Sequence, residues 1–326
     1  MKKVRILIAI AAAIALGIIA YRIGMRDIAA QVANLRLVLP IVLLSGLVRL
    51  LLQTRAWKIG LQAEGIDLPQ SRLLAVRLAS QAAGYLAAVG PVVSEPAKLV
   101  LLRNHVGMGA AASATFFETG TYWSTSAILG LVGTCAAAFL ISNDTAVCAA
   151  AGVFGVALVL LIGRRSLLSP VVRLFGSRAP NWLRSAESAE LRIRSFRDRQ
   201  PRAARGILAL DSIAQLVTLA EVGSVLWGVG MQPSVLEVLT VEAAGRMVKV
   251  LGAWIPGRIG ADEGGAAASF ALLGFPAAAG LILALARRVR DLIWCGVGIV
   301  WAATSNTDQP RVSPVVSEVS ICVEER

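Results

Sequence analysis

The sequence predicts an all-α polytopic membrane protein with about six full spans and two broken, re-entrant helical hairpins in an inverted-repeat arrangement. Hydrophobic residues make up 56% of the 326 residues, and charged residues only 16%, against ~25% in an average soluble domain. Several apolar stretches reach the ~18 residues that a helix needs to cross a bilayer. Two others are interrupted by Pro and Gly at membrane depth, which predicts the hairpins.

The net charge of +12 has its excess in loops beside apolar stretches. A nucleic-acid partner is therefore not expected, because the positive-inside bias and attraction to anionic lipid explain these loops better. The strongest signal of topology is the loop of residues 164–206. It contains eleven Arg and only three acidic residues, Glu187, Glu190 and Asp198. We expect this loop in the cytoplasm, with the protein in the inner (plasma) membrane and both termini cytoplasmic.

The first span expected is residues 4–20. Its basic start resembles a signal peptide, but no small-x-small cleavage site ends it, so we expect a retained helix. A polar connector is expected over residues 58–75. Residues 1–305 form one transmembrane domain, and the polar tail 306–326 is expected to be disordered. The remaining full spans expected are 37–53, 110–141, 146–163, 207–230 and 277–304.

The first break follows an apolar stretch, Ala79 to Val93, that is too short to cross the membrane. Gly90 and Pro91 interrupt it. Ser94 is a good N-cap and Pro96 is tolerated in a first turn, so we expect a second short helix from Ser94 to Arg103. Such a break at membrane depth must be buried in protein or line a wet cavity.

The second break follows the apolar stretch 235–255. Asp262 is expected to cap the short helix after it, which runs to about Leu273. Each half of the chain thus has an Ala-Ala-Gly helix entry, a Pro/Gly break and an acidic helix start. With the Arg-rich loop inside, the two hairpins open from opposite sides, as in an inverted repeat. The residues of the second break are Pro256, Gly257, Gly260 and Gly264.

Within the basic loop, apolar residues recur at helical spacing from Trp182 to Phe196. With Arg on the other face, this pattern predicts an amphipathic helix. It lies either on the membrane surface or against the cytoplasmic side of the protein itself.

Ionisable residues inside a membrane are costly, about 2.5–3.5 kcal/mol each. We expect them to line a polar cavity between the hairpins that holds a lipid head group, with Arg on phosphate. The acidic members can instead bind an amine or carry a proton, and the alternative for the whole set is internal salt bridges. The candidate head-group-binding residues are Glu95, Glu118, Arg246, Lys249, Arg258, Asp262, Glu263, Arg288 and Arg290.

Catalytic motifs are missing from the sequence: it has no Walker A motif, no G-x-S-x-G and no H-E-x-x-H. Its single histidine is His105, and its four cysteines form no C-x-x-C pair. We therefore expect no enzyme, no cofactor and no metal site. An intramembrane acid/base pair of Glu95 and Glu263 remains a weaker alternative.

The motifs at the two breaks, G-P-x-x-S-E-P and P-G-x-x-G-x-x-E-G, resemble those of the lysylphosphatidylglycerol synthase transmembrane region, or flippase-like family, over residues 5–305. The Gly274 turn followed by R-R-V-R is similar as well. In bifunctional members this region is taken to move an aminoacylated lipid between leaflets. The short tail after the last span implies a stand-alone member without the synthase half.

The resemblance implies a lipid translocator for a phospholipid or another isoprenoid or glycolipid head group. Its expected partners are membrane lipids and enzymes of lipid or glycan synthesis. One departure is Glu118, where the family often has a basic residue. The alternative is a non-transporting accessory subunit of a lipid or glycan biosynthesis pathway.

Overall fold

The computed structural model describes residues 25–86, 90–103, 106–142 and 194–304, apart from 253, 254, 256, 257 and 259, and also residue 191. Within these ranges the secondary structure is helical, with no strand, as the sequence predicts. The predicted spans 4–20 and 146–163 and the tail 306–326 lie outside the described residues. The helices are α2 (Met25–Ala63), α3 (Gln70–Leu86), α4 (Gly90–Leu102), α5 (Met108–Ser142), α9 (Pro201–Gly228), α10 (Val235–Leu251), α11 (Ala261–Leu272) and α12 (Ala277–Thr304).

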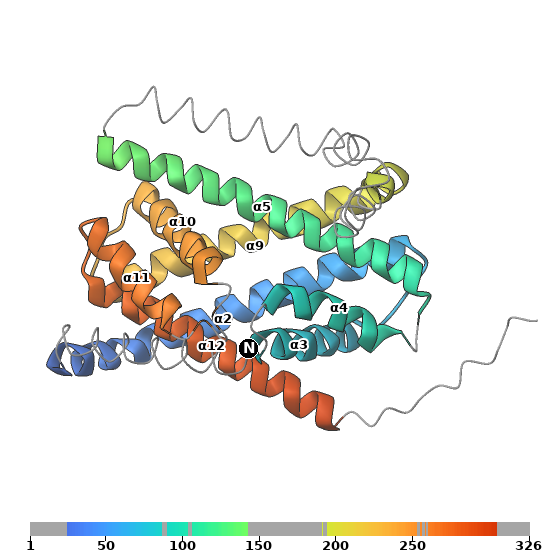
Figure 1. Cartoon of the computed structure of the whole chain (residues 1–326), viewed down its shortest axis with the longest axis horizontal. Coiled ribbons are helices and arrows are strands. Elements are labelled where there is room, and N and C mark those ends of the chain that lie inside the picture. The colour runs from blue at the N-terminus through green and yellow to red at the C-terminus, as the bar shows by residue number, and fades with distance from the viewer. Residues whose placement is uncertain are drawn as a thin grey trace, which may run out of the picture.

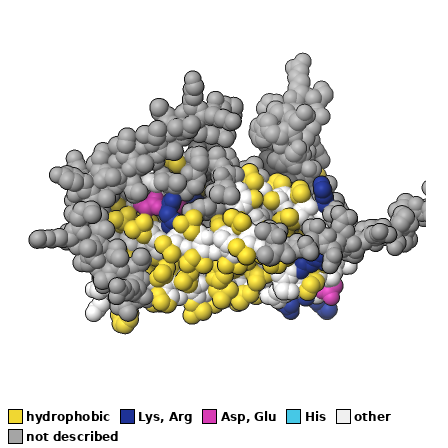
Figure 2. Space-filling model, turned by 90° about the horizontal axis from the view of Figure 1, so that it is seen from below, with side chains coloured by type: hydrophobic (Ala, Val, Ile, Leu, Met, Phe, Trp, Pro, Cys, Tyr) yellow, Lys and Arg dark blue, Asp and Glu magenta, His cyan; other side chains and the backbone are white. Residues whose placement is uncertain are grey.

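Three of these helices are long and apolar enough to cross a membrane. They run over Val38–Ala63, Gly109–Leu140 and Pro201–Gly228, which overlap three of the predicted spans. On the face in Figure 2, hydrophobic side chains cover most of the described surface, while Lys and Arg gather toward one end. A surface of this kind fits lipid better than water.

Helix α2 continues beyond its predicted end. Trp57 and Leu61 are fully buried in the core, so packing favours a helix up to Ala63. The connector to α3 is therefore only residues 64–69, and the predicted polar connector over 58–75 is wrong.

Helices α2 and α9 pack against each other in opposite directions (Figure 1). Gly60 lies against Ile207, and Val38 lies against Gly228 at the other end. Helix α10 packs on α5, and α12 on α3 and α11. The pair α3 and α4 and the pair α10 and α11 lie toward opposite ends of the molecule (Figure 1).

The first hairpin begins its second helix earlier than predicted. Helix α4 begins at Gly90, with Pro91 in its first turn, where a missing N–H costs nothing. Ser94 and Pro96 therefore lie inside α4, and the prediction that Ser94 caps it is wrong. Residues 87–89, between α3 and α4, lie outside the described residues.

In the second hairpin, α11 begins at Ala261 after Gly260, whose φ of 80° is left-handed. The Gly260 N–H donates to Glu263 Oε2 at 2.9 Å. Glu263 thus accepts the backbone N–H at the start of α11, and the prediction that Asp262 caps this helix is wrong. Gly264 lies inside α11, and Gly274 makes the expected turn with φ 77°. Pro256 and Gly257 lie outside the described residues.

Candidate functional site

A cavity of about 860 Å³ lies among the helices. It lies close to the middle of two candidate spans, because its walls include residues from Gly46 to Gln53 on α2 and from Tyr122 to Thr134 on α5. Helices α10 and α12 form the other walls. The cavity therefore lies between the central parts of two long apolar helices. Its aromatic lining residues are Tyr122, Trp123 and Trp294.

The lining of this cavity is strongly basic. It contains five cationic side chains and two carboxylates, so its net charge is positive. Positive charge in a poorly solvated space attracts an anion. The cations are Arg49, Arg246, Lys249, Arg258 and Arg290, and the carboxylates are Glu242 and Asp291.

Three of the five cations already have carboxylate partners. Arg246 pairs with Glu242 at 2.9 Å, and Arg290 pairs with Asp291 at 3.0 Å. Arg258 pairs with Asp262 at 3.3 Å, outside the cavity lining.

Arg49 and Lys249 differ from these three cations. Neither forms an ion pair with any carboxylate in the described ranges. Arg49 makes a long hydrogen bond to Thr218 Oγ1, at 3.4 Å, from α2 to α9. Carboxylates of the buried network act on both cations only electrostatically, Glu221 on Arg49 and Glu242 on Lys249. The two side chains come from opposite halves of the chain.

A buried ion-pair network supports the basic wall. Arg287 on α12 donates to Glu221 of α9 at 2.7 Å and to Glu242 of α10 at 3.0 Å. Glu221 also accepts from Arg290 at 2.7 Å and from Ser45 of α2 at 2.5 Å. The Glu221 carboxylate and the Arg287 guanidinium therefore connect α2, α9, α10 and α12 around the cavity.

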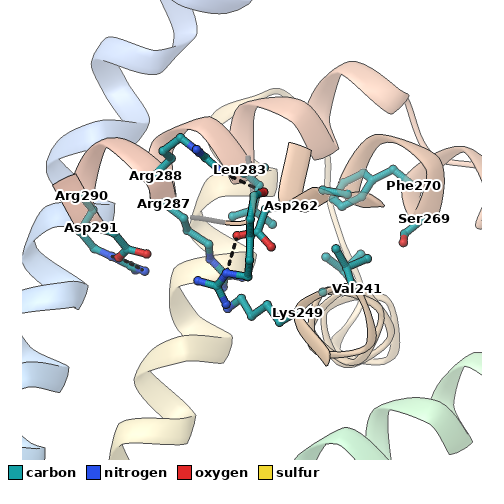
Figure 3. A pocket seen from close by; sticks show the side chains of 15 residues that line it. Val241, Lys249, Asp262, Ser269, Phe270, Leu283, Arg287, Arg288, Arg290 and Asp291 are labelled. Carbon is teal, nitrogen blue, oxygen red and sulfur yellow. Dashed lines mark hydrogen bonds and ion pairs between the residues drawn. The ribbon is translucent and has the colours of Figure 1, made fainter. Parts of the chain in front are cut away.

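A smaller pocket of about 60 Å³ lies beside the cavity, between α10, α11 and α12 (Figure 3). It shares Lys249 and Arg258 with the cavity. Arg288 pairs with Glu263 and donates to the carbonyl of Arg258 at 3.2 Å. Arg258 has φ 50°, a left-handed conformation that is costly for a non-glycine residue. The Arg288 contact helps to hold that backbone beside the pocket.

A second charged cluster lies apart from the cavity, where α3, α4 and α5 meet. Arg77 donates to Glu118 Oε1 at 2.5 Å. Lys98 pairs with Glu95 at 2.9 Å and lies 3.7 Å from Glu118. Both cations lie over the ring of Trp57. Both carboxylates of this cluster, Glu95 and Glu118, thus have cationic partners within it.

The predicted site residues are therefore not all in one place. Arg246, Lys249, Arg258 and Arg290 line the cavity. Asp262 and Arg288 line only the smaller pocket. Glu263 is 2% exposed. Its carboxylate accepts the Gly260 N–H at the start of α11 and pairs with Arg288. Glu95 and Glu118 belong to the second cluster.

Residues 4–297 match the family model of the lysylphosphatidylglycerol synthase TM region. The chain belongs to this family. The resemblance expected from the two breaks is thus confirmed. No curated protein and no solved structure matches the chain. Membership of the lysylphosphatidylglycerol synthase TM family, together with apolar helices of spanning length, makes the chain a membrane protein.

In this member of the lysylphosphatidylglycerol synthase TM family, sequence reasoning did not select Arg49, and it treated Glu221 and Arg287 only as charges inside apolar spans. Arg49 lies within the predicted span 37–53, near its basic end. Glu221 and Arg287 were not linked, because they are 66 residues apart. The sequence did hold a sign of this pair. An acidic residue in one apolar helix and a basic residue in another each need a partner of opposite charge.

The described part of this family member holds no group of three or more His, Cys, Asp and Glu arranged for a metal ion. Cys135 and Cys295 are free thiols. The chemistry available at the cavity is therefore electrostatic binding by guanidinium and ammonium groups.

Proposed function

We propose that this chain moves a phospholipid, or another lipid with an anionic head group, between the leaflets of the inner membrane. The observation that supports this most is the pair Arg49 and Lys249, two cations in a cavity of about 860 Å³ that form no ion pair with a carboxylate of the described residues. A cavity of ~300–1,000 Å³ suits a small ligand. The head group would occupy the cavity while the acyl chains stay in the bilayer.

The lining favours phosphate over other groups. Arg49 and Arg246 offer planar guanidinium donors, and Lys249 adds an ammonium. Hydrogen bonds to charged groups contribute ~1.5–3 kcal/mol each. Binding of this strength offsets part of the cost of taking a phosphate out of water. The sequence has no Walker A motif, so the movement would be passive or coupled to an ion gradient.

The inverted repeat belongs to this proposal. Two pairs of short helices, α3 with α4 and α10 with α11, lie toward opposite ends of the molecule (Figure 1). In transporters with inverted repeats, broken hairpins of this kind open from opposite sides and meet at the substrate site. The cavity receives Gln81 from the first pair and Lys249 from the second.

The proposed orientation follows the positive charge. Arg103, Arg202 and Arg205 are exposed, and they lie at the end of the molecule where α4 ends and α9 begins. The positive-inside rule assigns that end to the cytoplasm. Both termini and the basic loop 164–206 then lie on the cytoplasmic side.

The test is lipid movement in reconstituted liposomes with fluorescent phosphatidylglycerol and a membrane-impermeant quencher. We expect wild type to move the lipid. Arg49→Gln and Lys249→Gln should each slow it about tenfold, because each removes one cation–phosphate contact. The matched control is Arg55→Gln, an exposed residue on the same helix as Arg49, which should move lipid like wild type.

A second comparison uses phosphatidylcholine and a polyprenyl phosphate. We expect anionic lipids to move faster than the zwitterionic one. If wild type moves none of the three lipids, the translocator proposal is wrong, and a non-transporting accessory subunit is the better description. If Arg55→Gln slows movement as much as Arg49→Gln does, the cavity is not the site.

A further inference from the structure

Asp211 is the most isolated charged group in the described helices. It lies in α9, one of the candidate spans, and is 0% exposed. Neither of its carboxylate oxygens has a hydrogen-bond partner among the described residues. An ionised carboxylate buried without partners is very costly, whereas the neutral acid is far less so. The environment therefore favours a proton on Asp211.

The charged cluster of the first hairpin faces Asp211 from three helices. Arg77 of α3, Lys98 of α4 and Glu118 of α5 all act on it electrostatically. Within this cluster the two cations are already balanced by Glu95 and Glu118. Ionisation of Asp211 would thus leave one excess negative charge among the described charged groups of this cluster.

The described cations on the other helices packed on α9 lie at the surface or have other contacts. Ile207 lies against Gly60 of α2 and Thr218 bonds Arg49, so residues near 56 lie opposite Asp211. There α2 offers Ala56, which is buried, and Arg55, which is exposed. The nearest charged contacts from α10 and α12 lie farther along α9, where Arg246 bonds Gln215 and Arg290 bonds Glu221.

The cluster also has unused hydrogen-bonding capacity. Arg77 Nε and Glu118 Oε2 are buried and have no hydrogen-bond partner among the described residues. Buried groups without partners are rare in proteins and need a reason. One reason is a second arrangement, in which Arg77 leaves Glu118 and pairs with Asp211.

We propose that Asp211 is a proton-binding site that couples lipid movement to a proton gradient. In the state described here its carboxyl group holds the proton. When Arg77 turns toward Asp211, the O–H bond breaks, the proton passes to water, and the carboxylate pairs with the guanidinium. Lys98 then lies between two carboxylates, Glu118 at 3.7 Å and the partly exposed Glu95 at 2.9 Å. This inference rests on the proposed translocator function.

Gln53 connects this site to the cavity. Its Oε1 accepts from Arg77 at 3.1 Å, and the same residue lines the cavity. Movement of Arg77 would therefore change the cavity wall one helical turn from Arg49. Proton binding and lipid binding can influence each other through this contact.

The first experiment needs no lipid movement. Infrared spectra of the purified full-length protein at neutral pH should show the carbonyl-stretch band of a protonated carboxylic acid. We expect Asp211→Asn and Asp211→Ser to lose this band, and Asp67→Asn, a change at an exposed loop carboxylate, to keep it. A wild-type protein without the band, or an Asp211→Asn protein that keeps all of it, overturns the proposal.

The second experiment tests coupling in the liposomes described above. With a pH gradient imposed, the rate of lipid movement by wild type should change several-fold in one direction of the gradient. Asp211→Asn should move lipid at one rate, whatever the gradient. If Asp211→Asn responds to the gradient as wild type does, the site is not the coupling site. If wild type has the infrared band but moves no lipid, the translocator function fails and the proton site stands.

Discussion

At the residue scale, the cavity depends on buried charges that neutralise one another. Glu221 is 2% exposed and accepts from Arg287, Arg290 and Ser45. Removing one partner of a buried ion pair leaves the other without compensation, which costs much more than the pair itself contributes. This carboxylate is therefore expected to dominate the local stability.

We predict that Glu221→Gln lowers the stability of the protein by about 3–5 kcal/mol, because Arg287 and Arg290 each lose one of two carboxylate partners in a buried site. Thermal unfolding in detergent measures this. The control is Asp198→Asn, which removes an exposed carboxylate 3.2 Å from Arg197 and should cost about 0–1 kcal/mol. Equal unfolding temperatures for the two variants would show that Glu221 is not the centre of the network.

Arg258 is the second residue-scale case, since its φ of 50° is left-handed. We predict that Arg258→Gly is more stable than Arg258→Ala by about 1–2 kcal/mol, because only glycine adopts that conformation without strain. Both variants lose the same guanidinium, so their difference isolates the backbone. Thermal unfolding of the two proteins side by side provides the measurement, and an Ala variant as stable as the Gly variant contradicts the prediction.

At the element scale, small residues let α5 and α10 approach closely. A Cβ added at Gly133 would lie 2.3 Å from the carbonyl oxygen of Leu239 and 2.6 Å from the Cβ of Ala243. Such contacts are typical of helices that pack in membranes through small residues. The close approach brings Arg246 and Lys249 of α10 to the cavity wall.

We predict that Gly133→Ala destabilises the protein by about 1–3 kcal/mol, as overpacking does. It should also slow lipid movement, because α10 must shift. The control is Gly296→Ala on α12, where an added Cβ meets nothing within 4 Å. The unfolding temperature and the rate of lipid movement in liposomes are the two measurements. If Gly133→Ala matches Gly296→Ala in both, the prediction is wrong.

The sequence predicted the helical hairpins better than their boundaries. Apolar length and Pro/Gly breaks were enough to expect α3 with α4 and α10 with α11. The starts of α4 and α11 differ from the prediction. Helix α4 begins at Gly90, with Pro91 and not Ser94 in its first turn. At the start of α11, Glu263 and not Asp262 accepts the backbone N–H. Partners across the fold, such as Arg77 with Glu118, depend on helix packing, which a local pattern does not report.

At the scale of the whole molecule, α9 is expected to cross the membrane from the cytoplasm outward. We predict that Arg202→Cys, before its second turn, reacts with an impermeant maleimide from the cytoplasmic side. Gln232→Cys, just after α9, should react from the opposite side. Both positions are exposed, and the native cysteines are replaced by Ser in both proteins. Reaction of both positions from one side would contradict the proposed orientation.

The contact between Glu221 and Arg287 also has a consequence for the order of synthesis. The acid lies on α9 and its base lies 66 residues later on α12. A ribosome delivers α9 to the membrane first, so Glu221 waits there without its partner, at a cost of about 2.5–3.5 kcal/mol. Biogenesis therefore includes an interval in which Glu221 can bond Ser45 of α2 but has no arginine of α12 as a partner. The arrival of the last described helix ends that interval.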